Sequence, residues 1–380
     1  MLGVVLIVLA VVLLSGALLL SHDSPCAAAP AVPANTVAMK AAVHRCYGPP
    51  DVVRIESIAK PTPGDQGVLV KVHAASVNPL DWHLMRGNPY FMRIGMGLGS
   101  PQDVRVGVDF AGTVEAVGKS VTRLKPGDEV FGGWEGTLAE YVSVSQDAAL
   151  ALKPTNVTFE QAAATPVAAL TALQALRDKG KLQAGQKVLI NGASGGVGTF
   201  AVQIAKSYGA EVTGVTSARN VELVRSLGAG QVIDYTHEDY TVGSQRYDLI
   251  IDLVANHSFL DNRRVLKPQG TYIGIGGGGV AEGGFLGPMT AALKLVVLSP
   301  FVSQKAEFFV ADLNKEDMTR LANLMQAGKV TPVIDKHYPL DDAVAALRYL
   351  ERGHARGKVI VTMDAATPGH SEESTSTPSP

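Results

Sequence analysis

Residues 187–206 read KVLINGASGGVGTFAVQIAK, and this stretch decides the fold. It begins with a short apolar run, continues through a glycine-rich turn, and ends in a longer segment with apolar residues at helical spacing. A strand, a tight turn and a helix in this order are typical of the first half of a strand–helix–strand unit. The stretch therefore predicts the start of a parallel sheet.

The turn at 193–198 differs from the pattern G-x-G-x-x-G by one small residue, because Ala193 stands at the first position. Gly195 would let a diphosphate approach the backbone, and Gly198 would let helix and strand pack closely. The helix N-terminus would add free N–H groups and a partial positive charge. We predict dinucleotide binding by the whole turn, with a purely structural tight turn as the alternative: Ala193, Ser194, Gly195, Gly196, Val197 and Gly198.

The second strand of this unit, at 211–217, bears on the choice of dinucleotide. NAD-selective sites carry an acidic residue on the ribose hydroxyl about 20 residues after the glycine turn. Here the strand ends in Thr216 and Ser217, and Arg219 and Asn220 follow. Because no carboxylate is present to repel a 2′-phosphate and an arginine is available to bind one, the sequence favours NADPH. The alternative is that Arg219 is merely solvated at a helix start.

Strand and helix patterns continue to alternate in the second half of the chain, with strands expected at 231–235, 247–254 and 270–278. This alternation predicts a doubly wound parallel α/β sheet covered on both faces. The first half is different. Short strands separated by glycine and proline turns are expected there, which predicts a small β barrel, at 66–77, 107–118, 129–133 and 136–144.

Composition narrows the function further. The 380 residues carry 33 basic and 35 acidic side chains, so the net charge is −2 and no overall field would attract nucleic acid. Only Cys26 and Cys46 are present, which excludes a disulfide framework and a cysteine-rich zinc lobe. A globular enzyme-like body without nucleic-acid partners is expected.

The two ends of the chain differ from this body. Residues 2–20 are uncharged and long enough to cross a bilayer as a helix, so we expect an N-terminal transmembrane anchor within 1–21. The alternative is a cleaved signal and export. The first basic side chains follow this segment and favour a cytoplasmic body. Residues 22–38 are expected to be a linker and 365–380 a disordered tail.

Seven segments together resemble the zinc-free quinone oxidoreductase branch of the medium-chain dehydrogenase/reductase superfamily. They are AAVHRCYGPPDVV, VKVHAASVNPLDW, GVDFAGTVEAVG, KPGDEVFG, AAATPVAALTA, ASGGVG and GKVIV. The resemblance spans 39–364 and implies a GroES-like barrel at 39–164, a Rossmann domain at 165–312, and a return to the barrel at 313–364. It also implies a cofactor cleft between the two domains.

The resemblance assigns further site residues. Asn78 and Asp81 match a polar pair at the floor of the nicotinamide pocket, and Tyr90 lies near the pocket tyrosine, one residue out of register. For Asn78 and Asp81 a helix-capping role is an alternative. The remaining matches imply contacts with the cofactor: Thr171 near the nicotinamide ribose, Tyr235 over the adenosine phosphate end, and Gly276 and Gly277 beside the nicotinamide. Tyr235 could equally be a core residue.

Zinc-dependent relatives of this family need a cysteine near position 78 and a G-H-E segment near 107–109, and both are missing. His73, Asp81 and His83 are close in sequence but lack the spacing of metal ligands. Without a Lewis acid, electron-poor substrates are the easiest hydride acceptors. We therefore expect an NADPH-dependent reductase of quinones or α,β-unsaturated carbonyls. The alternatives are an NADPH-binding scaffold or sensor without turnover and a metal-dependent alcohol dehydrogenase; a homodimer could form through an edge strand at 308–311.

Overall fold

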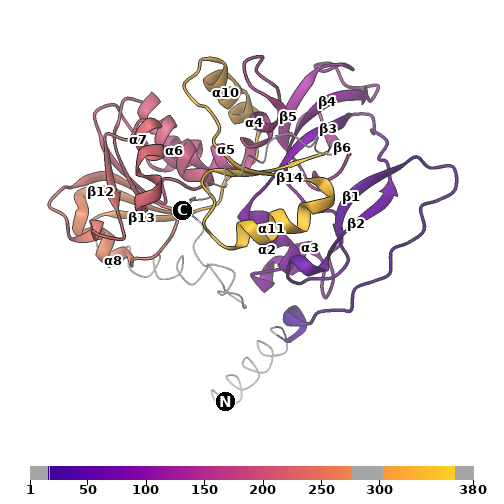
Figure 1. Ribbon diagram of the computed structural model, residues 1–380, viewed down its shortest axis with the longest axis horizontal. Coiled ribbons are helices and arrows are strands. Elements are labelled where there is room, and N and C mark those ends of the chain that lie inside the picture. The colour runs from indigo at the N-terminus through magenta and orange to yellow at the C-terminus, as the bar shows by residue number, and fades with distance from the viewer. Residues whose placement is uncertain (1–15, 17, 276–302, 364–380) are drawn as a thin grey trace, which may run out of the picture.

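The computed structural model describes residue 16 and residues 18–275 and 303–363. The described chain forms two lobes (Figure 1), one built around a parallel sheet and one around a mixed sheet of mainly antiparallel strands. The last part of the chain, yellow in Figure 1, leaves the first lobe and returns to the second. Gly276, Gly277 and the tail at 365–380 lie outside the described residues.

The first lobe is a six-stranded sheet in which every neighbouring pair is parallel where its register is given. Its order, β10-β9-β8-β11-β12-β13, is the doubly wound order in which the first and fourth strands are adjacent. The sheet is the predicted Rossmann sheet. Its strands are β8 Lys187–Asn191, β9 Glu211–Thr216, β10 Gln231–Asp234, β11 Tyr247–Asp252, β12 Leu266–Ile275 and β13 Lys305–Phe309.

Both faces of this sheet are buried, as a continuous apolar strand requires. Val188 and Ile190 of β8 belong to one hydrophobic cluster, which includes residues of the two helices that cover that face. Leu189 belongs to a second cluster on the opposite face, with Tyr240 and Phe259. The helices of this lobe are α5 Pro166–Gln174, α6 Gly196–Ser207, α7 Val221–Ser226 and α8 Phe259–Asn262.

The second lobe is the GroES-like part. Its main sheet has the order β14-β15-β3-β4-β5-β7, with β6 paired to β3, and a separate hairpin joins β1 and β2. The C-terminal strands β14 and β15 complete the sheet that the N-terminal half begins. The strands are β1 Ala38–His44, β2 Val53–Ala59, β3 Gly67–Val77, β4 Asp109–Val117, β5 Glu129–Gly133, β6 Tyr141–Ser145, β7 Ala149–Leu152, β14 Ile334–Pro339 and β15 Lys358–Thr362.

Short helices connect these strands and join the lobes. Asn78 and Pro79 start the helix after β3, as the sequence predicts, and α11 packs against that helix, where Arg86 forms an ion pair with Glu351. The helices are α2 Pro79–Arg86, η2 Tyr90–Met92, α3 Arg93–Met96, α4 Phe159–Ala163, η3 Ala175–Lys179, α10 Lys315–Gln326 and α11 Ala343–Glu351.

The N-terminal segment was expected to be a membrane anchor followed by a free linker. Most of 2–20 lies outside the described residues, and within the part that is described no helix is long and apolar enough to cross a membrane. The linker prediction needs correction at its start, because residues 20–26 pack against the body. Arg93 binds the carbonyl oxygens of Leu20 and His22 there. A disulfide joins Cys26 to Cys46, so the two cysteines form one bond although they are too few for a framework.

Candidate functional site

The glycine-rich turn lies where the strand order of the parallel sheet reverses. The turn follows β8, which has β9 on one side and the later strand β11 on the other, so that the strand order reverses here. Ligands of doubly wound sheets bind at this position. Gly195 caps α6, and the first helical bond runs from the Thr199 N–H to the Gly195 carbonyl oxygen. The Gly195 N–H donates to the Gly192 carbonyl oxygen, and the N–H groups of Val197 and Gly198, in the first turn of α6, have no acceptor within the helix and are suited to bind an anion.

Two glycines of the turn are needed for different reasons. A Cβ on Gly198 would lie 2.1 Å from the Gly192 carbonyl oxygen, so a side chain there would collide with the backbone. A Cβ on Gly195 would meet its nearest atom at 3.4 Å, and the backbone at Gly195 (φ −79°) is open to any residue. Gly198 thus serves the packing of helix on strand, whereas Gly195 leaves open space above the turn.

Ser194 connects the turn to the end of the next strand. Its Oγ accepts hydrogen bonds from Thr216 Oγ1 (2.7 Å) and Asn220 Nδ2 (3.0 Å). Asn220 is buried, and its Oδ1 has no hydrogen-bond partner among the described residues. An orphaned buried acceptor beside a cluster of free N–H groups fits a site that a polar ligand completes.

The predicted adenosine-end residues lie around the same strand end. The Tyr235 N–H donates to the Thr216 carbonyl oxygen, so this tyrosine lies beside the end of β9, with its ring more than half exposed rather than in the core. Ser217 is partly buried, and Arg219 is exposed and donates to the His354 carbonyl oxygen at 3.2 Å. Whether these side chains contact a nucleotide stays a prediction.

The returning chain at 354–358 also lies against the turn, which the sequence pattern did not reveal. The Gly357 N–H donates to the Ser194 carbonyl oxygen (2.9 Å), and Gly357 pairs with Gly195 in an isolated parallel bridge. A Cβ on Gly196 would lie 3.2 Å from Cδ of Lys358. The returning chain thus places Lys358 next to the helix that starts at the turn.

Asp109 is the centre of a buried polar cluster on the barrel side of this contact. Its Oδ2 accepts hydrogen bonds from Ser76 Oγ (2.9 Å) and Asn78 Nδ2 (2.9 Å). Lys358 Nζ forms an ion pair with the same oxygen at 3.3 Å. The Val167 N–H, in the first turn of α5, donates to Oδ1 at 3.0 Å. Asp109 therefore links β3, β4, β15 and the first helix of the Rossmann lobe.

Asn78 lies inside this cluster with a fixed amide orientation. Lys358 Nζ donates to Asn78 Oδ1 and to the Val77 carbonyl oxygen, while Asn78 Nδ2 donates to Asp109. The Asn78 amide has a second N–H besides the one bound to Asp109, and the Asn78 side chain also interacts with the Asp81 carboxyl. Lys358 and Asp109 are almost fully buried, at 3% and 0% exposure. Neither Lys358 nor Asp109 was a predicted site residue. The sequence around each of them, GKV and GVD, does not indicate that the two side chains form a pair.

Asp81 holds the backbone of Asn78 in place. Its Oδ2 accepts the Asn78 N–H at 2.6 Å, which is the capping arrangement that competed with a site role in the sequence. Burial raises the pKa of the Asp81 carboxyl to about 7, and the negative charge of Asp109 adds to the increase. Its other oxygen, Oδ1, has no partner among the described residues. Asp81 is thus a buried acid whose pKa lies far above that of a free carboxyl, so that it holds a proton at mildly acidic pH.

The other predicted residues lie at varying distances from this cluster. Thr171 is buried in α5, and its hydroxyl donates to the Val167 carbonyl oxygen at 2.7 Å, one turn from the group that binds Asp109. Tyr90 packs its ring against the Arg93 guanidinium, and no contact of Tyr90 with Asn78 or Asp81 is seen in the described chain. Gly276 and Gly277 fall outside the described residues.

The three side chains considered as metal ligands do not converge. His73 Nε2 lies 3.0 Å from Thr113 Oγ1, and the His73 ring packs on Phe159. His83 Nδ1 lies 3.0 Å from the Asn88 carbonyl oxygen. Within residues 18–275 and 303–363, no group of three or more potential ligand side chains could hold a metal ion.

A second buried hydrogen-bond network connects the strand ends where the strand order reverses. Asp252 Oδ1 accepts from Asn191 Nδ2 (2.9 Å), and Asp252 Oδ2 accepts from the Tyr272 hydroxyl (2.7 Å). Asn191 also lies within hydrogen-bond distance of the Tyr240 hydroxyl. Burial raises the pKa of both tyrosines. These bonds fix the ends of β8, β11 and β12 beside the turn.

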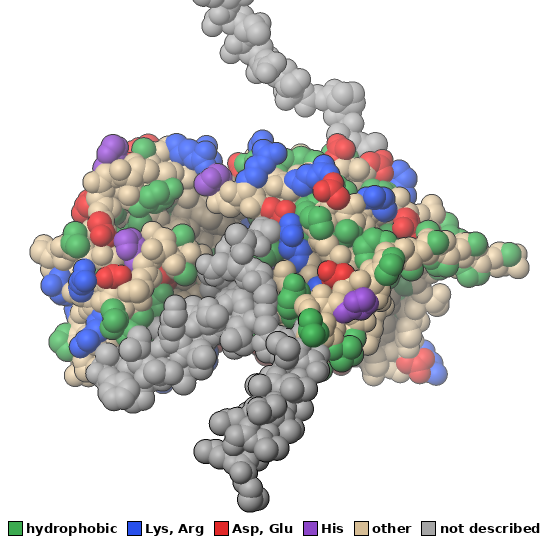
Figure 2. All heavy atoms as spheres, turned by 90° about the horizontal axis from the view of Figure 1, so that it is seen from below, with side chains coloured by type: hydrophobic (Ala, Val, Ile, Leu, Met, Phe, Trp, Pro, Cys, Tyr) green, Lys and Arg blue, Asp and Glu red, His purple; other side chains and the backbone are tan. Residues whose placement is uncertain are grey.

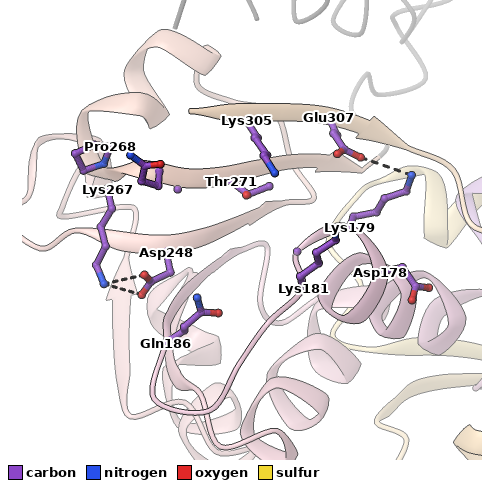
Figure 3. Close-up of a pocket in the computed structure, with 13 residues that line it drawn as sticks. Asp178, Lys179, Lys181, Gln186, Asp248, Lys267, Pro268, Thr271, Lys305 and Glu307 are labelled. Atoms are coloured by element: carbon purple, nitrogen blue, oxygen red, sulfur yellow. Dashed lines mark hydrogen bonds and ion pairs between the residues drawn. The ribbon is translucent and has the colours of Figure 1, made fainter. Parts of the chain in front are cut away.

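A hollow in the surface lies elsewhere, at the opposite end of the parallel sheet (Figure 3). It has a volume of about 830 Å³, and it is lined by lysines and carboxylates, two pairs of which are bonded: Lys267 with Asp248, and Lys179 with Glu307. Because these residues precede the strands or lie at their amino ends, the hollow is not where a doubly wound sheet binds nucleotides.

Charges do not gather into a single-sign patch on the face shown in Figure 2. Acidic and basic side chains are interspersed over both lobes there. This distribution accords with the net charge of −2 and gives no basic stripe along which nucleic acid would bind.

Comparison with known proteins identifies the family. Residues 64–154 match the alcohol dehydrogenase GroES-like domain, and 227–361 match the zinc-binding dehydrogenase model. The chain is 37% identical over 328 residues to mouse mitochondrial NAD(P)H oxidoreductase RTN4IP1 (78% of this chain, 81% of the relative). It is 35% identical over 338 residues to tomato 2-methylene-furan-3-one reductase (85% and 79%).

A solved structure agrees with these relatives. The quinone oxidoreductase from Coxiella burnetii superposes with a TM-score of 0.76 at 31% identity, covering 86% of this chain and all of the other. The printed names of both relatives describe oxidoreductases; the GroES-like match covers β3 to β7 of the second lobe, and the other match runs from the later part of the Rossmann lobe into β15. The chain belongs to the quinone oxidoreductase branch of the medium-chain dehydrogenase/reductase superfamily.

Proposed function

We propose that this oxidoreductase transfers hydride from NADPH to a quinone or an α,β-unsaturated carbonyl compound. The observation that carries the proposal is the contact between the glycine turn and the buried cluster of Asn78, Asp109 and Lys358. This contact brings the start of α6, which we propose binds the diphosphate, close to the oriented amide of Asn78 in the other lobe.

The residues present fit a bound dinucleotide. Gly195 leaves open space at a helix start with free N–H groups, and the orphaned Asn220 Oδ1 can accept from a ribose or phosphate hydroxyl. Ser217 and Arg219 follow the end of β9, where no carboxylate opposes a 2′-phosphate, and Tyr235 lies beside them. This arrangement supports NADPH over NADH. When bound, the cofactor supplies the hydride.

On the acceptor side, Asn78 is the proposed orienting residue. Its second amide N–H would bind the carbonyl oxygen of the acceptor or the nicotinamide amide, with the amide held in place by Lys358 and Asp109. Asp81 fixes the Asn78 backbone, and its raised pKa reduces the negative charge that it adds to the cluster. Proton delivery to the reduced product is assigned to Tyr90 or a water.

Metal independence is part of the proposal. The positions of the zinc ligands in related dehydrogenases are occupied here by Asn78 and by residues 107–109, and Asp109 is already bound by Lys358. A neutral or cationic cluster is a poor metal site. We expect activity to be unchanged by a strong chelator and elemental analysis to find no stoichiometric zinc.

Location and assembly complete the proposal. The apolar segment 2–20 is proposed to attach the protein to a membrane. Basic residues after the segment favour a cytoplasmic body, but the Cys26–Cys46 disulfide favours the oxidising side, where such bonds persist. Labelling of the free thiols of Cys26 and Cys46 after a rapid acid quench distinguishes the cytoplasmic location from the oxidising one. A homodimer would form through β13, the edge strand of the described sheet, and 308–311.

The deciding experiment uses the full chain in detergent with NADPH and a panel of quinones and enones. Oxidation of NADPH that depends on the acceptor supports the proposal, and Gly195→Ala serves as the matched variant with a methyl group in the cofactor's path. Saturable NADPH binding with no turnover on the whole panel would instead support a scaffold or sensor.

A further inference from the structure

Two stretches of the chain that are far apart in sequence form one exposed apolar face. Thirteen large hydrophobic side chains are exposed among the described residues, and five of them belong to 18–19 and 91–98. We call these five the N-terminal apolar face: Leu18 (65% exposed), Leu19 (59%), Phe91 (38%), Ile94 (72%) and Leu98 (54%).

Arg93 holds the two stretches together. Its Nη1 donates to the carbonyl oxygens of Leu20 (3.0 Å) and His22 (3.2 Å), and it pairs with Asp23 at 2.9 Å. Its Nε binds the Gly87 carbonyl oxygen, and the guanidinium packs between the rings of Tyr47 and Tyr90. Arg93 is 1% exposed, and its bonds to Leu20, His22 and Asp23 fix residues 20–23 against the body.

Two further bonds keep the segment in place. The Ser24 N–H donates to the Gly99 carbonyl oxygen at 2.8 Å, and the Cys26–Cys46 disulfide follows two residues later. Figure 1 shows the first described turn of the chain below α2 and α3. The exit of residues 1–17 from the body is therefore fixed beside α3, not left to a flexible linker.

The two segments that carry the face contain almost no charge, and the exposed Asp23 next to them is paired with Arg93. Residues 87–100 contain one charged residue, Arg93, which is buried, and residues 2–21 contain none. The uncharged run of 2–20 has the length of a bilayer core and ends at this face. A soluble partner that covered the N-terminal apolar face would have to bind next to the apolar run of 2–20. A lipid bilayer can contact the face and the run at the same time.

We propose that the N-terminal apolar face rests on a lipid bilayer, with Phe91, Ile94 and Leu98 in the interface beside the apolar N-terminal run. The inference rests on the proposed membrane attachment and adds a second contact to it, from the body itself. It also places the loop that carries Tyr90 at the lipid surface, so a lipid-soluble quinone can reach that loop from the bilayer.

The test uses tryptophan emission of the full chain reconstituted in phosphatidylcholine vesicles with plain or brominated acyl chains. Ile94→Trp reports on the face, and Val242→Trp is the matched control, because Val242 is similarly exposed (68%) on the other lobe. Trp82 and Trp134 give the same background in both variants. We expect brominated lipid to remove about half of the emission that Ile94→Trp adds and none of that added by Val242→Trp.

Equal quenching of the two variants would overturn the proposal. So would unquenched Ile94→Trp emission, whether the chain stays off the vesicles or forms a dimer through this face. Should Ile94→Trp not fold, Leu98→Trp provides the same readout. NADPH oxidation measured on the same vesicles reports on the reductase separately, so the failure of one proposal is distinguishable from the failure of the other.

Discussion

The glycine turn and the Asp109 cluster meet at one site but differ in how the chain builds them. The turn is local, since one stretch of twelve residues supplies the strand end, the tight turn and the helix start. The cluster is assembled from β3, β4, the start of α5 and β15, which are separated by up to 282 positions between Ser76 and Lys358. A local site tolerates change elsewhere in the chain, whereas the assembled one depends on both lobes being in place.

Removing the cation of the cluster should have the largest effect. Lys358→Met leaves Asp109 buried without its ion-pair partner, which we expect to lower the free energy of unfolding by about 3–5 kcal/mol. Denaturant titration measures the loss. Lys40→Met, which removes an exposed pair with Asp341, should cost less than about 1 kcal/mol. Equal losses would mean that Asp109 does not need the charge of Lys358.

A second pair of variants separates packing from binding within the turn. Gly198→Ala forces a methyl group against the Gly192 carbonyl oxygen and should cost about 1–3 kcal/mol of stability. Gly195→Ala meets nothing closer than 3.4 Å, so it should retain stability while weakening NADPH binding at least tenfold. Thermal unfolding and a fluorescence titration of NADPH measure the two effects. If Gly195→Ala binds NADPH like the parent, the open space above the turn is not the diphosphate site.

The pH dependence of stability tests the buried acid of the cluster. The pKa of Asp81 is raised to about 7, so between pH 4 and 7 the folded protein holds a proton that the unfolded chain releases. Stability therefore falls as pH rises through this window, by up to about 1.4 kcal/mol per pH unit. Asp81→Asn lacks this contribution, so the difference in unfolding free energy between variant and parent should change with pH across this window.

Asp128 provides the control with the opposite sign. The hydrogen bond from the Lys125 side chain lowers the pKa of Asp128, so its contribution is present at neutral pH and lost on acidification. Asp128→Asn should accordingly give a difference that shrinks as pH falls. A flat difference for Asp81→Asn from pH 4 to 7 would show that this carboxyl is ionised in the folded protein.

The smallest effect concerns cofactor choice at the edge of the turn. Arg219 is exposed, and among the described residues it donates one hydrogen bond, to the His354 carbonyl oxygen, so it can turn toward a 2′-phosphate at little cost. Arg219→Ala should weaken NADPH about tenfold and leave NADH unchanged, because only NADPH carries the extra phosphate. The measurement is the dissociation constant of NADPH and of NADH for parent and variant. Equal losses of affinity for both cofactors would show that Arg219 does not bind the 2′-phosphate.

The turn shows what could be predicted from the sequence. The strand at 187–191, the turn and the following helix were all expected, because their signals lie within one window of the chain. Asn78 and Asp81 were identified through the motif that they share, and the structure adds that Asp81 binds the Asn78 backbone.

Asp109 and Lys358 could not be predicted in the same way. Each is an ordinary charged residue in its own segment, and their pairing arises only when β15 joins β3 and β4 in one sheet. The docking of residues 20–26 was missed for the same reason. A proline- and alanine-rich segment resembles a linker until a buried arginine 71 positions away binds its backbone.

The most direct measurement is a crystal structure of the full chain with NADPH. The diphosphate is predicted to bind the N–H groups of Val197 and Gly198 at the start of α6, with the nicotinamide beside Asn78 and the 2′-phosphate near Arg219. A nucleotide bound in the hollow lined by Lys267 and Lys305, or a turn whose N–H groups point away from the diphosphate, would contradict the proposed reaction.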